Sequence, residues 1–148
     1  MRLAALGIVL PKPVTPSASY VQAAASGPFV FLAGNDPIGP DGRLRCGVVG
    51  ADVSVAAARE HARFTGIQLL AVMHRHLGDL DRVARIVKVF GMVRAVPGFA
   101  DHEAVIDGCS DLFVQIFGEA GRHARTAIGL PSLYAGMTIE IEAVVAVK

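Results

Sequence analysis

The fold is decided by residues 137–147, which read MTIEIEAVVAV. Successive side chains of a β-strand point to opposite faces, so the odd-numbered residues share one face and the even-numbered residues the other. The odd-numbered face is wholly apolar, whereas the even-numbered face carries Glu140 and Glu142 beside Val144 and Ala146. We therefore predict a strand whose apolar face meets helices and whose mixed face meets another subunit.

Apolar periodicity in the rest of the chain predicts two helices among five strands. One helix begins at Ser54 and ends at Gly78, and the other begins at Asp101 and ends at Gly118. The strands are expected at residues 20–25, 29–33, 82–93, 125–129 and 138–147, the first two being joined by a turn. This mixed order indicates an α+β fold, with one mixed sheet and both helices packed on a single face.

The chain has 148 residues, a length that suits one domain with its own core. We therefore predict a single domain over residues 1–148 that starts with a Pro-rich lead-in of about residues 1–19. Hydrophobic residues make up 53% of the chain and charged residues only 18%. Part of this apolar surface is expected to be buried between subunits.

Charge and cysteine content argue against several functional classes. The net charge is +1 without a basic run, so no nucleic-acid partner is expected. Cys46 and Cys109 have no metal-binding spacing and form no disulfide framework, which favours a reducing compartment. The apolar residues 3–10 resemble a short signal peptide but stop at a proline after eight residues. A cytoplasmic protein without a membrane partner or a metal is expected.

Arg125 and Glu140 are charged residues in segments that otherwise have the pattern of buried strands. A charge in such a place is costly unless it is paired or bound to a ligand. The guanidinium of Arg125 matches a carboxylate with two parallel hydrogen bonds, and an ion pair with Glu140 or Glu142 is the alternative. The two glutamates lie about 7 Å apart on one face, so one of them can hold a proton near neutral pH.

Five short motifs follow one another along the chain. They are YVQ at residues 20–22, AGN at 33–35, HARTA at 123–127, LP at 130–131 and IEIEA at 139–143. Together they resemble the reactive-intermediate deaminase (Rid) family, which is also called YjgF or L-PSP endoribonuclease. The resemblance covers most of the chain, and the arginine block followed by IEIEA is its most specific part.

The resemblance implies a chorismate-mutase-like fold that assembles as a homotrimer with substrate clefts between subunits. It also implies the hydrolysis of reactive 2-imino acids or enamines to 2-oxo acids and ammonia, without a cofactor. By position, Arg125 would bind the substrate carboxylate and Glu140 would assist the transfer of a water or a proton. Tyr20 would lie near the cleft, and the backbone of Gly34 would border it.

Asn35, beside Gly34, and Asp107, on the second helix, complete the candidate substrate-binding residues. Asp107 stands where the family usually has an asparagine, and Ala127 stands where a cysteine is common, so the chain resembles a divergent subgroup. On the residues alone, Asp107 is equally a solvated helix residue.

Two other functions stay open at this point. A trimer that binds small carboxylates without turnover would use Arg125 in the same way. A ribonuclease is suggested only by one of the family's names, and no aligned histidine pair or basic patch supports it. We further expect Cys109 to be buried and His123 to lie at the surface, the alternative being that His123 borders the cleft beside Arg125. We recognise no nucleophilic serine or cysteine in the pattern.

Overall fold

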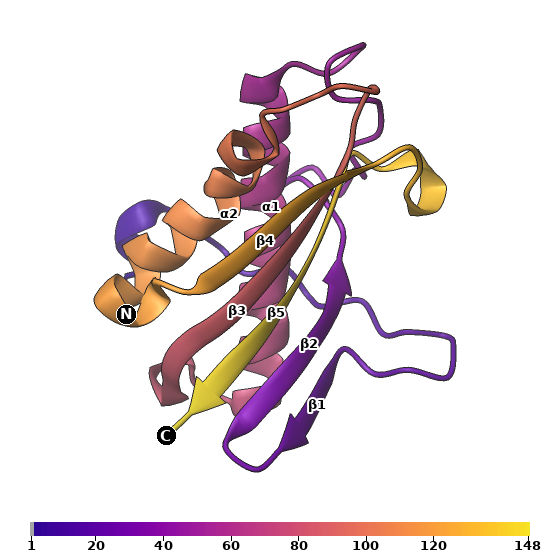
Figure 1. Ribbon diagram of the computed structural model, residues 1–148. Coiled ribbons are helices and arrows are strands. Elements are labelled where there is room, and N and C mark those ends of the chain that lie inside the picture. The colour runs from indigo at the N-terminus through magenta and orange to yellow at the C-terminus, as the bar shows by residue number, and fades with distance from the viewer. Residues whose placement is uncertain (1) are drawn as a thin grey trace.

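The computed structural model describes residues 2–148 and contains one five-stranded sheet and two long helices (Figure 1). The helices are α1 (Val55–Leu77) and α2 (His102–Phe117). The strands are β1 (Ala23–Ser26), β2 (Phe29–Asn35), β3 (Val83–Arg94), β4 (Ala124–Leu130) and β5 (Ile139–Val147). The predicted α+β fold and element order are confirmed.

The first strand is shorter than predicted. Residues 20–22 were expected within it, but β1 begins at Ala23. Only the carbonyl of Gln22 still accepts a bond across the ladder, from the amide of Ala33 at 2.9 Å. The chain leaves the sheet edge at this point, which leaves the side chain of Tyr20 exposed.

The strand order in the sheet is β1-β2-β5-β3-β4, so the strand that decides the fold lies at the centre (Figure 1). β5 pairs antiparallel with both β2 and β3. β3 and β4 run parallel, because α2 carries the chain back to the start of the next strand. β4 therefore forms one edge of the sheet, and its side chains lie beside α2.

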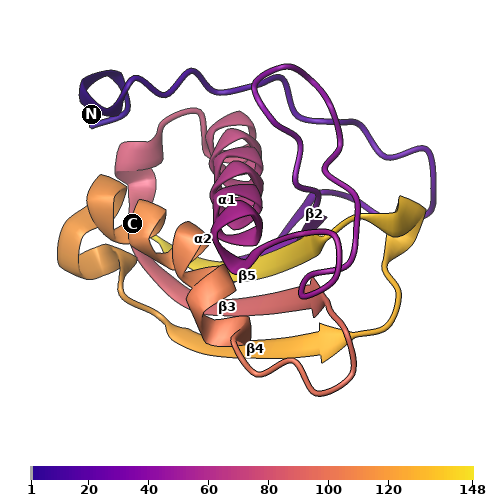
Figure 2. The same ribbon diagram turned by 90° about the horizontal axis from the view of Figure 1, so that it is seen from above.

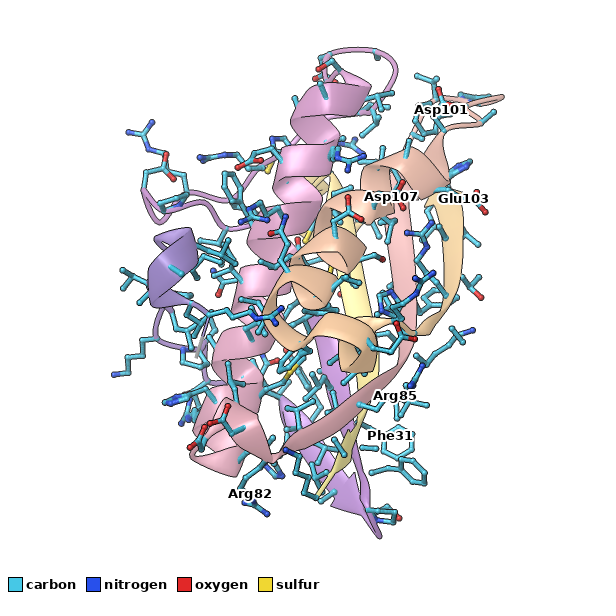
Figure 3. The ribbon with its side chains drawn as sticks, turned by 90° about the vertical axis from the view of Figure 1, so that its left-hand side faces the viewer. Phe31, Arg82, Arg85, Asp101, Glu103 and Asp107 are labelled. Carbon is cyan, nitrogen blue, oxygen red and sulfur yellow. The ribbon has the colours of Figure 1, made fainter. Side chains whose placement is uncertain are left out.

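The two faces of the sheet differ in what covers them. Both helices lie on the same side of the sheet (Figure 2), and Ile139 and Ile141 of β5 are fully buried beneath them. On the other face Phe29 is 40% exposed and Phe31 is 49% exposed. Figure 3 shows Phe31 on the side of the sheet away from the helices. The face expected to meet another subunit is therefore bare in the single chain.

The helices begin and end where the sequence predicts, although their ends differ in detail. The Ser54 hydroxyl accepts a hydrogen bond from the amide of Ala57 at 3.1 Å, which caps α1. α2 starts after Asp101 as predicted, but the Asp101 side chain makes no capping hydrogen bond. Gly78 and Gly118 end the two helices.

The two helices approach each other closely at glycines. A Cβ on Gly66 of α1 would lie 2.9 Å from Leu112 Cδ2 and 3.1 Å from Cys109 Sγ on α2. A Cβ on Gly108 of α2 would overlap the backbone carbonyl of Arg59 on α1. These contacts explain the glycine that interrupts the apolar stripe of α1. They fix the position of α2 above β3 and β4.

The lead-in runs along the helix side of the molecule (Figure 2). Leu3, Ile8 and Leu10 pack against the hydrophobic core. Farther along, Nη1 of Arg75 on α1 contacts the Pro13 carbonyl at 3.5 Å. Within residues 2–148, no helix is both long enough and apolar enough to cross a membrane.

We predict that Gly108→Ala destabilises the protein by about 2 kcal/mol. Overpacking against the α1 backbone costs about 3 kcal/mol, and the better helix propensity of alanine returns about 1 kcal/mol. Urea denaturation measures the change. Glu103→Ala, at an exposed position of the same helix, should shift the free energy of unfolding by less than about 0.5 kcal/mol. Equal stability of Gly108→Ala and the wild type would show that the helices can separate without cost.

Candidate active site

Arg125 lies on the wall of an open hollow of about 580 Å³, between α2 and the start of β4. We call it the Arg125 hollow; its polar lining residues are Asp107, Ser110, Asp111, Gln115, Arg122, His123 and Arg125. Asp107 and Ser110 are three residues apart on α2 and therefore share one helix face. His123 and Arg125 are two residues apart on extended chain and point the same way.

Two hydrogen bonds hold the guanidinium of Arg125 in place. Its Nη1 donates to Asp107 Oδ1 at 2.7 Å and to Ser110 Oγ at 3.1 Å. Both of its hydrogen bonds to residues 2–148 use Nη1, so Nη2 and Nε are available to a ligand. The side chain is 19% exposed, which leaves it open to the hollow. Asp107 is thus an ion-pair partner of Arg125, and its side chain stays 41% exposed to solvent.

A second arginine competes for the same carboxylate. Arg59 of α1 lies 4.0 Å from Asp107 Oδ2 and 2.5 Å from Asp111 Oδ2. The shorter contact assigns Arg59 mainly to Asp111, which leaves Asp107 mainly to Arg125. All of these side chains are partly exposed, so solvent screens the pairs and they add little to stability. Their effect is to orient the guanidinium.

His123 is half-buried on the wall of the Arg125 hollow. The surface position expected from the sequence is therefore wrong, and the alternative position beside Arg125 is the one observed. Its Nδ1 lies 2.7 Å from the Gly121 carbonyl, and its Nε2 lies 2.9 Å from Ser110 Oγ. Burial lowers the pKa of His123, and the positive charge of Arg125 lowers it further, against the opposing effect of the Gly121 carbonyl. The ring is therefore neutral at neutral pH.

Glu140 lies in a different hollow, of about 490 Å³, which we call the Glu140 hollow. Tyr20, Gly34 and Asn35 line it too, so four of the six candidate residues from the sequence meet here. Lead-in residues 14–18 form another part of its wall. The hollow lies where β2 and β5 meet the lead-in.

The carboxyl end of Glu140 packs directly against the backbone of Gly34. A Cβ at this position would lie 2.6 Å from Glu140 Oε1. The pairing of β2 with β5 is irregular between Leu32 and Asn35, which brings this part of β2 against the glutamate. Any side chain here would displace the Glu140 carboxyl.

Asn35 is buried, and its amide is used within the protein. Nδ2 donates to Gln22 Oε1 at 3.1 Å and to the Ala33 carbonyl at 3.0 Å. Only its carbonyl oxygen remains for a ligand. Asn35 therefore serves mainly to hold residues 20–22 beside β2.

Glu140 has a raised pKa. Burial is the main cause, and the negative charges of Asp36 and Glu142 add to it. Burial also raises the pKa of Asp36, which lines the same hollow. Asp36 follows the AGN motif but was not recognised from the sequence. Such a carboxyl can both accept and donate a proton closer to neutral pH than an ordinary glutamate.

Arg125 and Glu140 lie on opposite faces of the sheet, so one chain does not bring them together. Arg125 is aligned with Val89, which is buried beneath the helices. Glu140 falls between two buried residues of β5 and points to the bare face. An ion pair of Arg125 with Glu140 or Glu142, which the sequence left open, is therefore wrong; Asp107 takes that place.

Comparison with known proteins shows which family the chain belongs to. The family model described as "YjgF/chorismate mutase-like, putative endoribonuclease" matches residues 1–139. This chain belongs to the YjgF family. The resemblance recognised from the five motifs is confirmed.

Among YjgF relatives, Protein TCP17 of Trypanosoma cruzi is 38% identical over 141 residues, covering 95% of this chain and 88% of the relative. The crystal structure of Atu1372 from Agrobacterium tumefaciens, a protein of unknown function, is also 38% identical. It covers 99% of this chain and 91% of its own, with a TM-score of 0.92. A "putative endoribonuclease" from Shewanella oneidensis is 27% identical, with a TM-score of 0.94 and coverage of 99% and 97%.

The sequence pattern of this YjgF chain also did not reveal the hydrogen bond between Ser110 and His123. Ser110 lies three residues after Asp107, and His123 lies two residues before Arg125. These spacings place each pair on one face, but only the packing of α2 on β4 joins the two pairs. Cys109, in contrast, is buried as expected, and burial raises the pKa of its thiol.

His61 is the second histidine whose neutral form the fold favours. Its Nδ1 lies 2.9 Å from Thr138 Oγ1, and burial together with the charge of Arg45 lowers its pKa. A depressed histidine pKa stabilises the fold above the unfolded pKa near 6.5, and this stabilisation is lost as the pH falls. His123 acts in the same direction.

We predict that the free energy of unfolding decreases from pH 7.5 to pH 5.5 through these two histidines. The double variant His61→Gln/His123→Gln should lose less stability over that interval than the wild type. Denaturant unfolding at several pH values measures the difference. The raised pKa values of Asp36 and Glu140 act in the opposite sense in both proteins, so they cancel in the comparison. Parallel curves for both proteins would contradict the assignment.

Proposed function

We propose that this protein hydrolyses small reactive 2-imino acids, or their enamine tautomers, to 2-oxo acids and ammonia without a cofactor. The observation that carries the proposal is the free side of the Arg125 guanidinium, which faces an open hollow while Asp107 and Ser110 hold its other side. Membership of the YjgF family is consistent with the proposal but does not specify the reaction.

Arg125 binds the substrate carboxylate through Nη2 and Nε. These two groups form a planar pair of donors that matches both oxygens of a carboxylate. Because Nη1 is already bonded to Asp107 and Ser110, the guanidinium loses little rotational freedom when the ligand arrives. Lysine would supply the charge but not this geometry.

Glu140 handles the proton and the water. As water adds to the imine carbon, the Glu140 carboxylate accepts a proton from it and gives that proton to the nitrogen, which forms a carbinolamine. The carboxylate then takes the hydroxyl proton of the carbinolamine and passes it to the nitrogen as the C–N bond breaks, which releases the 2-oxo acid and ammonia. A raised pKa suits this exchange because it is matched more closely to neutral pH than the pKa of an ordinary glutamate. Tyr20 lies on the same wall, and its exposed ring can close over the substrate.

A second copy of the chain completes the site. Arg125 and Glu140 occupy separate hollows on opposite faces of one sheet, so a shared substrate requires two subunits. The bare face carries the exposed rings of Phe29 and Phe31, an apolar surface of the kind that subunit interfaces cover. A homotrimer, as expected from the family resemblance, would cover this face and create three clefts.

We predict that Arg125→Ala lowers kcat/KM for imine hydrolysis about 100-fold. Charge-assisted hydrogen bonds to the carboxylate are worth about 3 kcal/mol. The imine is generated in situ from an amino acid by an amino-acid oxidase, and the release of ammonia and 2-oxo acid is followed. Arg43→Ala, at an exposed loop arginine, is the matched control and should retain full activity. Wild-type protein that is no faster than buffer would refute the proposed reaction.

We predict that Phe31→Arg reduces the wild-type oligomer to smaller species. A charged side chain on the bare face would have to be desolvated within the interface, which is costly. Sedimentation velocity measures the mass of each species. Val9→Arg adds the same charge at a lead-in position that is 88% exposed and should leave the oligomer intact. A wild-type protein that sediments as a monomer would remove the basis for a shared cleft.

The alternative of carboxylate binding without turnover has one observation in its favour. Asp107 already compensates part of the charge of Arg125, which weakens its hold on a charged substrate. Binding of a 2-oxo acid that depends on Arg125, without any acceleration of imine hydrolysis, would favour this alternative. The ribonuclease function named in the family description predicts RNA cleavage by the purified protein that is lost in Arg125→Ala.

A further inference from the structure

Ser110 makes one contact that the proposed imine hydrolysis does not use, its hydrogen bond with His123. Its Oγ lies 2.9 Å from His123 Nε2 and 3.1 Å from Arg125 Nη1. All three side chains line the Arg125 hollow, so the hydroxyl is accessible from solvent. A serine that touches both a histidine and a cationic donor has the parts of an activated nucleophile.

The positions of the protons follow from the partners. The Gly121 carbonyl can only accept, so His123 Nδ1, 2.7 Å away, must carry a hydrogen. In the neutral ring Nε2 then has a free lone pair, and Ser110 donates its hydroxyl proton to it. The N–H of Arg125 donates to the same oxygen. Ser110 therefore has its proton aimed at a base and its oxygen polarised by a cation.

The histidine is held in this orientation by its surroundings. Its ring packs edge-on against Phe113, with the ring centroids 6.1 Å apart. The Gly121 carbonyl fixes the tautomer, which is the task that a third residue performs in a catalytic triad. The ring is neutral because burial and Arg125 both lower its pKa, so the base form is present at neutral pH.

Neighbouring groups can stabilise the charges that form on His123 and on the substrate when Ser110 attacks. A protonated His123 would repel Arg125, but the Asp107 carboxylate lies 2.7 Å from the same guanidinium and balances it. The opposite charge, on the substrate oxygen, has donors within the hollow. These are the free Nη2 and Nε of Arg125 and the amide nitrogen of Gln115, whose oxygen is occupied by Arg63 at 3.1 Å.

We propose that Ser110 is a catalytic nucleophile and His123 its general base, which gives this protein a second hydrolytic activity toward small carboxylic esters. Ser110 Oγ forms a bond to the ester carbonyl carbon while its proton moves to His123 Nε2. The bond to the alcohol oxygen breaks, and the alcohol leaves with that proton. Water then attacks the acyl-serine by the same route and releases the acid. Both half-reactions are redox-neutral and need only water.

Two measurements test this activity. The full-length protein is treated with a fluorophosphonate, which phosphonylates activated serines, and the modified residue is located by peptide mass spectrometry. Hydrolysis of 4-nitrophenyl acetate is followed in parallel. We expect labelling at Ser110, and ester hydrolysis that falls to the rate of buffer in Ser110→Ala. In His123→Gln both labelling and turnover should fall about 100-fold or more, as for the loss of a general base.

Ser132→Ala, at an exposed serine outside the hollow, is the matched control and should keep both signals. Circular dichroism verifies that each variant is folded. Absence of label on Ser110 in folded wild-type protein would overturn the proposal, as would ester hydrolysis that is unchanged in Ser110→Ala. Neither result bears on imine hydrolysis, because that reaction forms no acyl-serine. Conversely, labelled Ser110 in a protein inactive on imines would leave the esterase activity standing alone.

Discussion

The close contact between α1 and α2 is the constraint on which the rest of the structure depends. Gly108 allows the backbone of α2 to reach the backbone of α1 at Arg59, and Gly66 allows the same approach from α1. A helix packed at this distance has little freedom to roll or slide. The residue next to Gly108 is Asp107, so the same contact places the carboxylate that orients Arg125. The contact between α1 and α2 at Gly108 therefore supports both the core and the candidate site.

The sheet separates the chemistry of the molecule into two halves. On the helix side, an arginine is held by an aspartate and a serine; on the bare side, burial and neighbouring carboxyls raise the pKa of a glutamate. A cation for binding and a carboxyl for proton transfer do not neutralise each other when a sheet lies between them. An assembly in which one subunit's edge strand meets the next subunit's bare face would bring the cation of one subunit close to the carboxyl of the next, while the sheet keeps the two groups of each single chain apart.

Periodicity predicted both helices, the strand order along the chain and the faces of β5, because each depends on residues close in sequence. The charges of Arg125 and Glu140 in apolar strands were likewise visible. The partner of Arg125 was not, because the alignment of β4 with β3 and the roll of α2 depend on distant contacts. For the same reason His123 was placed at the surface and Ser110 was overlooked.

The wall of the Glu140 hollow has an unusual origin, since residues 14–18 of the lead-in supply part of it. This segment is irregular chain, and it is tied to α1 by the weak contacts of Arg75 with Pro13 and Thr15. Mutations there alter the shape that a substrate meets while the sheet and helices keep their packing. Sequence changes in residues 14–18 can thus alter the range of ligands that the Glu140 hollow accepts, with little effect on folding, because the hydrophobic core does not depend on this segment.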